Sequence, residues 1–126
     1  MFDHVAFGVR DYEKSKAFYL KALAPLGVTI ASEGVPAYGA ELVRAGNNTS
    51  MIIRQADEKP ARLHIAFTAE TREQVDAFHR AALEAGGQDN GAPGLRPKYH
   101  ANYYAAFVID PDGHNVELVC HQPAAR

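Results

Sequence analysis

Hydrophobic and polar residues alternate along residues 2–9 (FDHVAFGV) and again along residues 62–69 (RLHIAFTA). A period of two is typical of strands that bury one face. In both segments the large apolar side chains share one face, while a histidine, His4 or His64, lies with small residues on the other. We therefore predict two strands, each with a histidine on its less apolar face.

Each of these strands is followed by a segment with the spacing of an amphipathic helix. The first begins after Asp11, a favourable N-cap, and is closed by Pro25 and Gly27. The second begins after Thr71, another favourable N-cap, and runs to Gly86. The pattern therefore predicts one helix after each histidine-bearing strand.

Short β-rich runs separated by turn residues follow both helices. In the first half they predict strands at 28–34, 38–44 and 49–55. In the second half they predict strands at 102–110 and 114–121, joined by the tight-turn sequence Asp-Pro-Asp-Gly, and a further short strand within 88–95. Both halves then have the order β-α-β-β-β.

The two halves also resemble each other in sequence. LHIAFTAETREQVDAFHRAALEAGG (63–87) aligns at a fixed offset with DHVAFGVRDYEKSKAFYLKALAPLG (3–27), and the two segments share His, Ala, Phe, Glu and Leu at matching positions. This internal repeat predicts an α+β fold of two paired βαβββ modules, with a curved mixed sheet that encloses a cup-shaped site. The modules span about 1–56 and 61–126 of one domain (1–126), joined by the polar linker 56–61.

Composition narrows the function classes. The net charge is −2 and no segment gathers Lys and Arg into a basic stripe, which argues against nucleic-acid binding. Cys120 is the single cysteine, so no intramolecular disulfide can form, and its place among apolar neighbours predicts burial. We see no signal peptide and no apolar run long enough for a membrane span, so we expect a soluble cytoplasmic protein.

Candidate chemistry lies on the polar faces of the predicted strands. An isolated histidine on a strand is more often structural, but the repeat places His4 and His64 at equivalent positions. In the last strand Glu117 alternates with apolar Val116 and Leu118, so its carboxylate should point toward the same enclosure. Two imidazoles and a carboxylate would form a divalent metal site with open coordination positions.

The segment GLRPKYHANYYAAF (94–107) is expected to form a lid or rim over this site. Arg96 could pair with an anionic substrate group, and His100 or Tyr104 could transfer a proton. The substrate contacts expected here and on the first half are Arg96, Tyr99, Tyr103 and Arg54. The alternative is that the tyrosines are strand or interface residues and His100 is simply exposed. We assign the other histidines to structure or solvent: His79, His114 and His121.

The early D-H-V, the central L-H-I-A-F and the final D-P-D-G-H-N-V-E-L make the chain resemble the vicinal oxygen chelate superfamily. This superfamily contains glyoxalase I, fosfomycin-resistance thiol transferases, extradiol dioxygenases, methylmalonyl-CoA epimerase and bleomycin-binding proteins. The resemblance implies a divalent metal (Zn, Mn, Ni or Fe) bound by His4, His64 and Glu117. Glyoxalase I would have a fourth, carboxylate ligand near Ile52 or Ile53, and this chain departs from it there.

The resemblance also implies a function and an assembly. It points to a small metal-dependent enzyme of the glyoxalase type, a lyase, isomerase or thiol transferase that acts on a small oxygenated substrate. Alternatives are a metal-free protein that sequesters a drug or metabolite, and an Fe(II) dioxygenase of the extradiol type. A homodimer is expected, and the site is formed either within one chain or with His4 of one subunit meeting His64 and Glu117 of the other.

Overall fold

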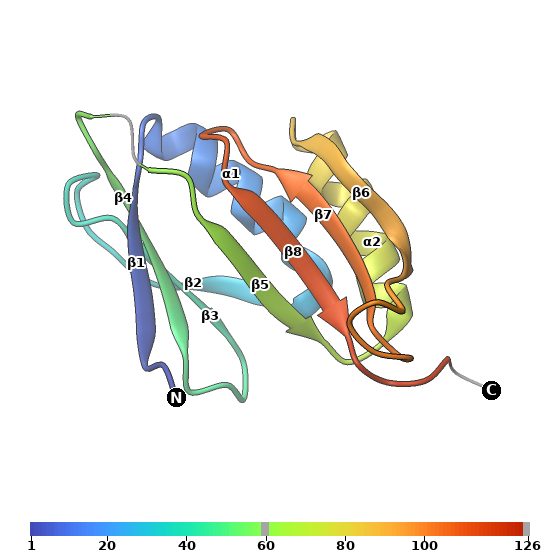
Figure 1. The fold of residues 1–126 in the computed structure, drawn as a ribbon. Coiled ribbons are helices and arrows are strands. Elements are labelled where there is room, and N and C mark those ends of the chain that lie inside the picture. Colours follow the sequence, from blue (N-terminus) through green and yellow to red (C-terminus); the bar gives the residue numbers. More distant parts are fainter. Residues whose placement is uncertain (59–60, 125–126) are drawn as a thin grey trace.

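The computed structural model describes residues 1–58 and 61–124, which form two βαβββ halves (Figure 1). The elements of the first half are β1 (His4–Val9), α1 (Tyr12–Ala22), the 3₁₀ helix η1 (Ala24–Leu26), β2 (Val28–Glu33), β3 (Ala40–Arg44) and β4 (Ser50–Gln55). Those of the second half are β5 (His64–Ala69), α2 (Arg72–Glu84), β6 (Gln88–Leu95), β7 (Tyr104–Ile109) and β8 (Asn115–Cys120).

Each half contributes one four-stranded mixed sheet. The strand orders are β1-β4-β3-β2 and β5-β8-β7-β6, and in each sheet the first and last strands of the half pair in parallel while the other pairs are antiparallel. The predicted α+β fold of two repeated modules is confirmed. The strand expected within 88–95 is β6, although its pairing with β7 is interrupted by register shifts on both sides of Gly91. Part of the predicted linker, residues 59–60, lies outside the described residues.

The helix ends follow the capping residues of the sequence. An Asp11 side-chain oxygen accepts a hydrogen bond from the Lys14 N–H at 3.1 Å. Thr71 forms a reciprocal capping box with Gln74. Helix α2 ends at Glu84, two residues earlier than expected, because Gly86 takes a left-handed φ of 96° that turns the chain into β6.

The apolar faces of the strands pack on the helices as predicted. Phe7 of β1 meets Tyr19 of α1 edge-on, with 6.0 Å between ring centroids, and both residues are buried. In the second half Phe78 of α2 and Leu118 of β8 belong to the same core. Cys120 is fully buried, as its apolar neighbours indicated. Neither helix in the described part of the chain has the length and apolar character needed to span a bilayer.

The two halves are joined through α1. Tyr19 donates a hydrogen bond to Asp110, and Ser15 of the same helix donates one to Asp112 at 3.3 Å, both at the turn between β7 and β8. In Figure 1, α1 accordingly lies behind the second sheet. The outer strands β1 and β5 do not pair with each other, and a cleft of about 650 Å³ lies between them.

Candidate functional site

The second half brings His64 and Glu117 together. Strands β5 and β8 pair in parallel with Ala66 opposite Glu117, and this register places His64 Nε2 2.8 Å from Glu117 Oε1. The Glu117 residue is 2% exposed, whereas the His64 side chain is 54% exposed. The imidazole therefore separates a buried carboxylate from solvent, and the two groups supply a nitrogen and an oxygen donor at one point.

Tyr103 completes the surroundings of this carboxylate. Its hydroxyl donates a hydrogen bond to Glu117 Oε2, the oxygen that His64 does not contact. Burial, and secondly this hydrogen bond to Glu117, raise the pKa of Tyr103 from 10.0 to about 12. Tyr103 is therefore a permanent donor at neutral pH, and it leaves Oε1 as the oxygen that faces His64.

The first half lacks the corresponding pair. The β1–β4 register sets Ala6 opposite Ile52, as Ala66 lies opposite Glu117, so Ile52 rather than Ile53 occupies the position of the carboxylate. His4 is exposed, and its Nδ1 lies 2.6 Å from Asp3 Oδ1. It borders the cleft between β1 and β5 together with His64. Across residues 1–58 and 61–124, however, the ligand atoms of His4, His64 and Glu117 do not form one close group.

His100 pairs with His121, which sequence reasoning had assigned to structure or solvent. His100 Nε2 lies 2.6 Å from His121 Nδ1, and the rings stack at an interplanar angle of 22°. The Asn102 backbone N–H donates to His100 Nδ1 at 3.1 Å, so the neutral ring carries its hydrogen on Nε2 and donates it to His121. The Tyr103 ring packs edge-on against both imidazoles, which places the pair beside Tyr103 and Glu117.

Tyr104, the neighbour of Tyr103, points to the opposite face. Its hydroxyl donates to Asp76 of α2 at 2.6 Å, because successive residues of β7 alternate between the two sides of the sheet. Tyr99 is exposed, with its ring 4.8 Å from that of Tyr103. Arg54 is exposed on β4, opposite Gly8 in the register, and so belongs to the other half. The structure thus groups Tyr99 and Tyr103 with Glu117 and leaves Tyr104 and Arg54 elsewhere.

A second cavity, of about 400 Å³, lies on the outer part of the second sheet. Its lining contains polar, cationic and aromatic residues: Asn90, Gly91, Arg96, Lys98, Tyr99, Phe107 and Asn115. Phe107 of β7 lies opposite Glu117 in the register, and its ring centroid is 6.2 Å from that of His64. The cavity therefore adjoins the His64–Glu117 pair. Sequence reasoning identified Arg96 and Tyr99 but missed the strand residues, because a pairing partner cannot be read from one strand alone.

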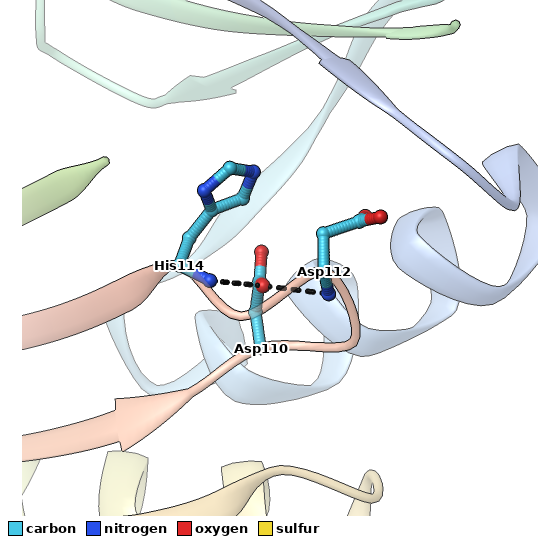
Figure 2. Close-up of side chains that lie close together, drawn as sticks. All are labelled: Asp110, Asp112 and His114. Carbon is cyan, nitrogen blue, oxygen red and sulfur yellow. Dashed lines mark hydrogen bonds between the residues drawn. The ribbon is translucent and has the colours of Figure 1, made fainter. Parts of the chain in front are cut away.

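Asp110, Asp112 and His114 form a buried group at the β7–β8 turn (Figure 2). One donor atom from each lies within 4.8 Å of the others, so the group could hold a metal ion by spacing. From the sequence, D-P-D-G-H predicts a tight turn and contributes to the family resemblance, but its alternating Asp, Asp and His are also a visible signal for a metal-binding group.

Most donor atoms of this group have partners within the protein, but His114 Nε2 is buried and has no hydrogen-bond partner among the described residues. Asp110 Oδ1 accepts from the Asp112 and His114 N–H groups at 2.9 and 2.8 Å, and Oδ2 accepts from Tyr19. His114 Nδ1 accepts from the Leu63 N–H at 3.0 Å, so the neutral ring carries its hydrogen on Nε2. Through these contacts the group connects the β7–β8 turn to α1 and to Leu63, the residue before β5.

His64 and Glu117 differ from this group in exposure, because the His64 imidazole is open to solvent beside a buried carboxylate. Imidazole and carboxylate suit Zn, Mn, Ni and Fe, and His64 lines the cleft between β1 and β5. Two protein ligands leave coordination positions open for substrate or for a further protein ligand.

Comparisons with known proteins agree with this architecture. Residues 1–118 match the model of the Glyoxalase/Bleomycin resistance protein/Dioxygenase superfamily. A glyoxalase/bleomycin resistance protein from Albidiferax ferrireducens T118 is 29% identical, with a TM-score of 0.79 and coverage of 98% of this chain and 99% of that one.

Two more distant structures share the fold. A glyoxalase/bleomycin resistance protein/dioxygenase family enzyme from Burkholderia phytofirmans PsJN is 18% identical, with a TM-score of 0.74 over 95% of this chain and 98% of that one. The oxidase ChaP-H2 is 21% identical, with a TM-score of 0.67 over 99% of this chain and 95% of that one.

Proposed function

Because the chain belongs to the glyoxalase/bleomycin resistance protein/dioxygenase superfamily, we propose that it is a small metal-dependent enzyme that acts on a small oxygenated substrate. The observation that carries this proposal is the His64–Glu117 pair, in which a buried carboxylate and an exposed imidazole lie 2.8 Å apart, with His64 lining the cleft between β1 and β5. A bound divalent ion would polarise neighbouring substrate oxygens and stabilise the negative charge that develops on them. Glyoxalase-like lyase or isomerase chemistry, or thiol transfer, is the proposed reaction class.

The surrounding residues have separate proposed roles. Tyr103 holds Glu117 through Oε2, which would leave Oε1 to coordinate a bound ion. His100, which shares a hydrogen bond with His121, exchanges a proton with the substrate. Arg96 and Tyr99 contact the substrate from the rim of the cavity. Tyr104 has no role in the chemistry in this proposal, because its hydroxyl is bonded to Asp76 on the helix side of the sheet.

A homodimer would supply the third ligand. His4 is exposed at the edge of its sheet, and the free edges of β1 and β5 are available to a second copy. We propose that His4 of one subunit joins His64 and Glu117 of the other, and that Arg54 reaches the substrate from the same side. Three protein ligands would still leave open positions for a chelating substrate.

Metal binding by stripped protein tests this proposal. We expect His64→Ala and Glu117→Gln each to weaken the binding of Zn, Mn, Ni or Fe by at least about tenfold in calorimetric titrations, because each removes a ligand. His4→Ala should weaken it too, and sedimentation should show a dimer. His79→Ala is the matched control, since the imidazole of that histidine pairs with Asp89 and not with His64 or Glu117.

Two results would overturn the assignment. Loss of binding in Asp112→Asn, with Glu117→Gln unchanged, would move the metal to the β7–β8 turn. Absence of metal binding by the wild-type protein would favour the second candidate, a metal-free binding protein. One observation supports that candidate: His64 Nε2 and Glu117 Oε1 lie 2.8 Å apart and can satisfy each other directly by a hydrogen bond.

A further inference from the structure

Arg96, the residue directly after strand β6, is held in a fixed orientation against that strand. Its Nη1 donates to the Gly94 carbonyl and its Nη2 to the Ala92 carbonyl, both at 2.8 Å. The guanidinium lies over the Phe107 ring, 5.4 Å from the centroid. Two of its five N–H groups are thus used within the protein and three remain. A guanidinium immobilised in this way loses little further conformational entropy when it binds a ligand.

The backbone beneath Arg96 is shaped to admit it. A Cβ atom at Gly91 would lie 3.2 Å from Nη2 of Arg96 and 2.9 Å from Cδ1 of Phe107, and a Cβ atom at Gly94 would lie 3.2 Å from Nη1. Any other residue at these two positions would press on the guanidinium or on the ring beneath it. The glycines therefore let the cation lie flat against the strand, at the wall of the cavity.

The cavity is cationic and has no carboxylate in its lining. Lys98 joins Arg96 there, with its Nζ 5.1 Å from the centroid of the Tyr99 ring. Within the described residues, neither Arg96 nor Lys98 forms an ion pair with an acidic side chain. A purely structural role would explain the two hydrogen bonds of Arg96 to β6. It would not explain a second cation beside it, or a cavity free of acidic groups.

We propose that this cavity binds the oxyanion of the substrate, a carboxylate or a phosphate, at Arg96 and Lys98, with a flat apolar part of the substrate beside the Phe107 ring, one face of which Arg96 covers. Phe107 lies opposite Glu117 in the strand register and near His64, so a substrate held there extends toward those residues. The substrate class is then a small anion with a planar apolar body and neighbouring oxygens. The last part rests on the proposed metal site, whereas the anion site itself does not.

Binding of three small probes to metal-stripped protein tests the anion site. Benzoate and phenyl phosphate carry the two oxyanions on one planar ring, and benzyl alcohol is the neutral analogue. We expect both anions to bind, benzyl alcohol to bind at least about tenfold more weakly, and Arg96→Met to weaken anion binding about tenfold or more. Whichever of the two anions binds more tightly shows whether the site prefers a carboxylate or a phosphate. Arg80→Met, on the exposed face of α2, is the matched control and should leave binding unchanged.

The remaining variants separate this proposal from others. Lys98→Met should weaken anion binding severalfold without disturbing β6. If Arg96→Met does not fold, Lys98→Met therefore still tests the anion site. His64→Ala should leave benzoate binding intact even where metal binding is lost, so failure of the metal site and failure of the anion site are distinguishable. Equal binding of benzoate and benzyl alcohol, or unchanged anion affinity in Lys98→Met and Arg96→Met, would overturn the proposal.

Discussion

Glu117 illustrates how a single position acquires its chemistry from its neighbours. A carboxylate that is 2% exposed needs a partner for each oxygen, and here His64 and Tyr103 provide one each. The two partners differ in kind. His64 is exposed and able to exchange its hydrogen bond for a ligand, whereas Tyr103 stays protonated and keeps the carboxylate in place.

The raised pKa of Tyr103 predicts a loss of stability in alkaline solution. The unfolded chain releases the phenolic proton from about pH 10, whereas the folded protein retains it up to about pH 12. The contribution to folding is therefore complete below pH 10 and is lost as the pH rises to 12. Urea unfolding at several pH values should show this decline, less steeply in Tyr103→Phe than in the wild type. Equal declines in the two proteins would contradict the assignment.

At the scale of elements, turns fix how the strands of each sheet meet. Gly39 closes the connection between β2 and β3 with a φ of 88°, and a Cβ atom there would lie 1.9 Å from the Ile53 carbonyl oxygen of β4. Gly46, between β3 and β4, has a similar φ of 80° but open space around it. A side chain at Gly46 would therefore meet backbone strain alone, whereas a side chain at Gly39 would meet the same strain and a steric overlap as well.

Substitution by alanine should affect these glycines unequally. Gly46→Ala should cost about 1 kcal/mol of unfolding free energy, because only the left-handed conformation is strained. Gly39→Ala should cost clearly more, since a backbone oxygen of β4 has to move. Chemical denaturation of both variants measures the difference, and equal costs would show that the β2–β3 turn relaxes freely.

At the scale of the whole molecule, the two halves are held together by polar contacts in a buried place. Tyr19 of α1 is fully buried, and burial followed by the nearby Asp110 raises the pKa of its hydroxyl well above the ordinary value. Asp110 in turn organises the β7–β8 turn through two backbone N–H groups. One hydrogen bond thus connects the first helix to the strand that carries Glu117.

Tyr19→Phe should destabilise the whole protein. It leaves an Asp110 oxygen unpaired in the interior, at a cost of about 1–3 kcal/mol. Tyr12→Phe on the same helix is the matched control and should cost less, because its partner Glu33 can be solvated instead. Thermal unfolding followed by near- and far-ultraviolet circular dichroism should give coincident transitions in the wild type. Separate transitions for the two halves would contradict this coupling.

The sequence by itself determined the features that depend on neighbouring residues. Strand and helix positions, the caps at Asp11 and Thr71, the burial of Cys120 and the duplication could all be predicted, because periodicity and capping act over a few residues. The helix end at Glu84 and the irregular pairing of β6 were less accessible, since both depend on how a glycine bends the chain.

Only the tertiary structure decided which side chains meet. The repeat makes His4 and His64 equivalent in sequence, yet the register pairs one with Glu117 and gives the other half Ile52 at that place. The hydrogen bond from Tyr19 to Asp110 and the contact of Arg96 with the Phe107 ring were equally hidden, because these partners come from a helix far away in sequence and from another strand. Distances between elements are set by packing over the whole chain, and no local pattern encodes them.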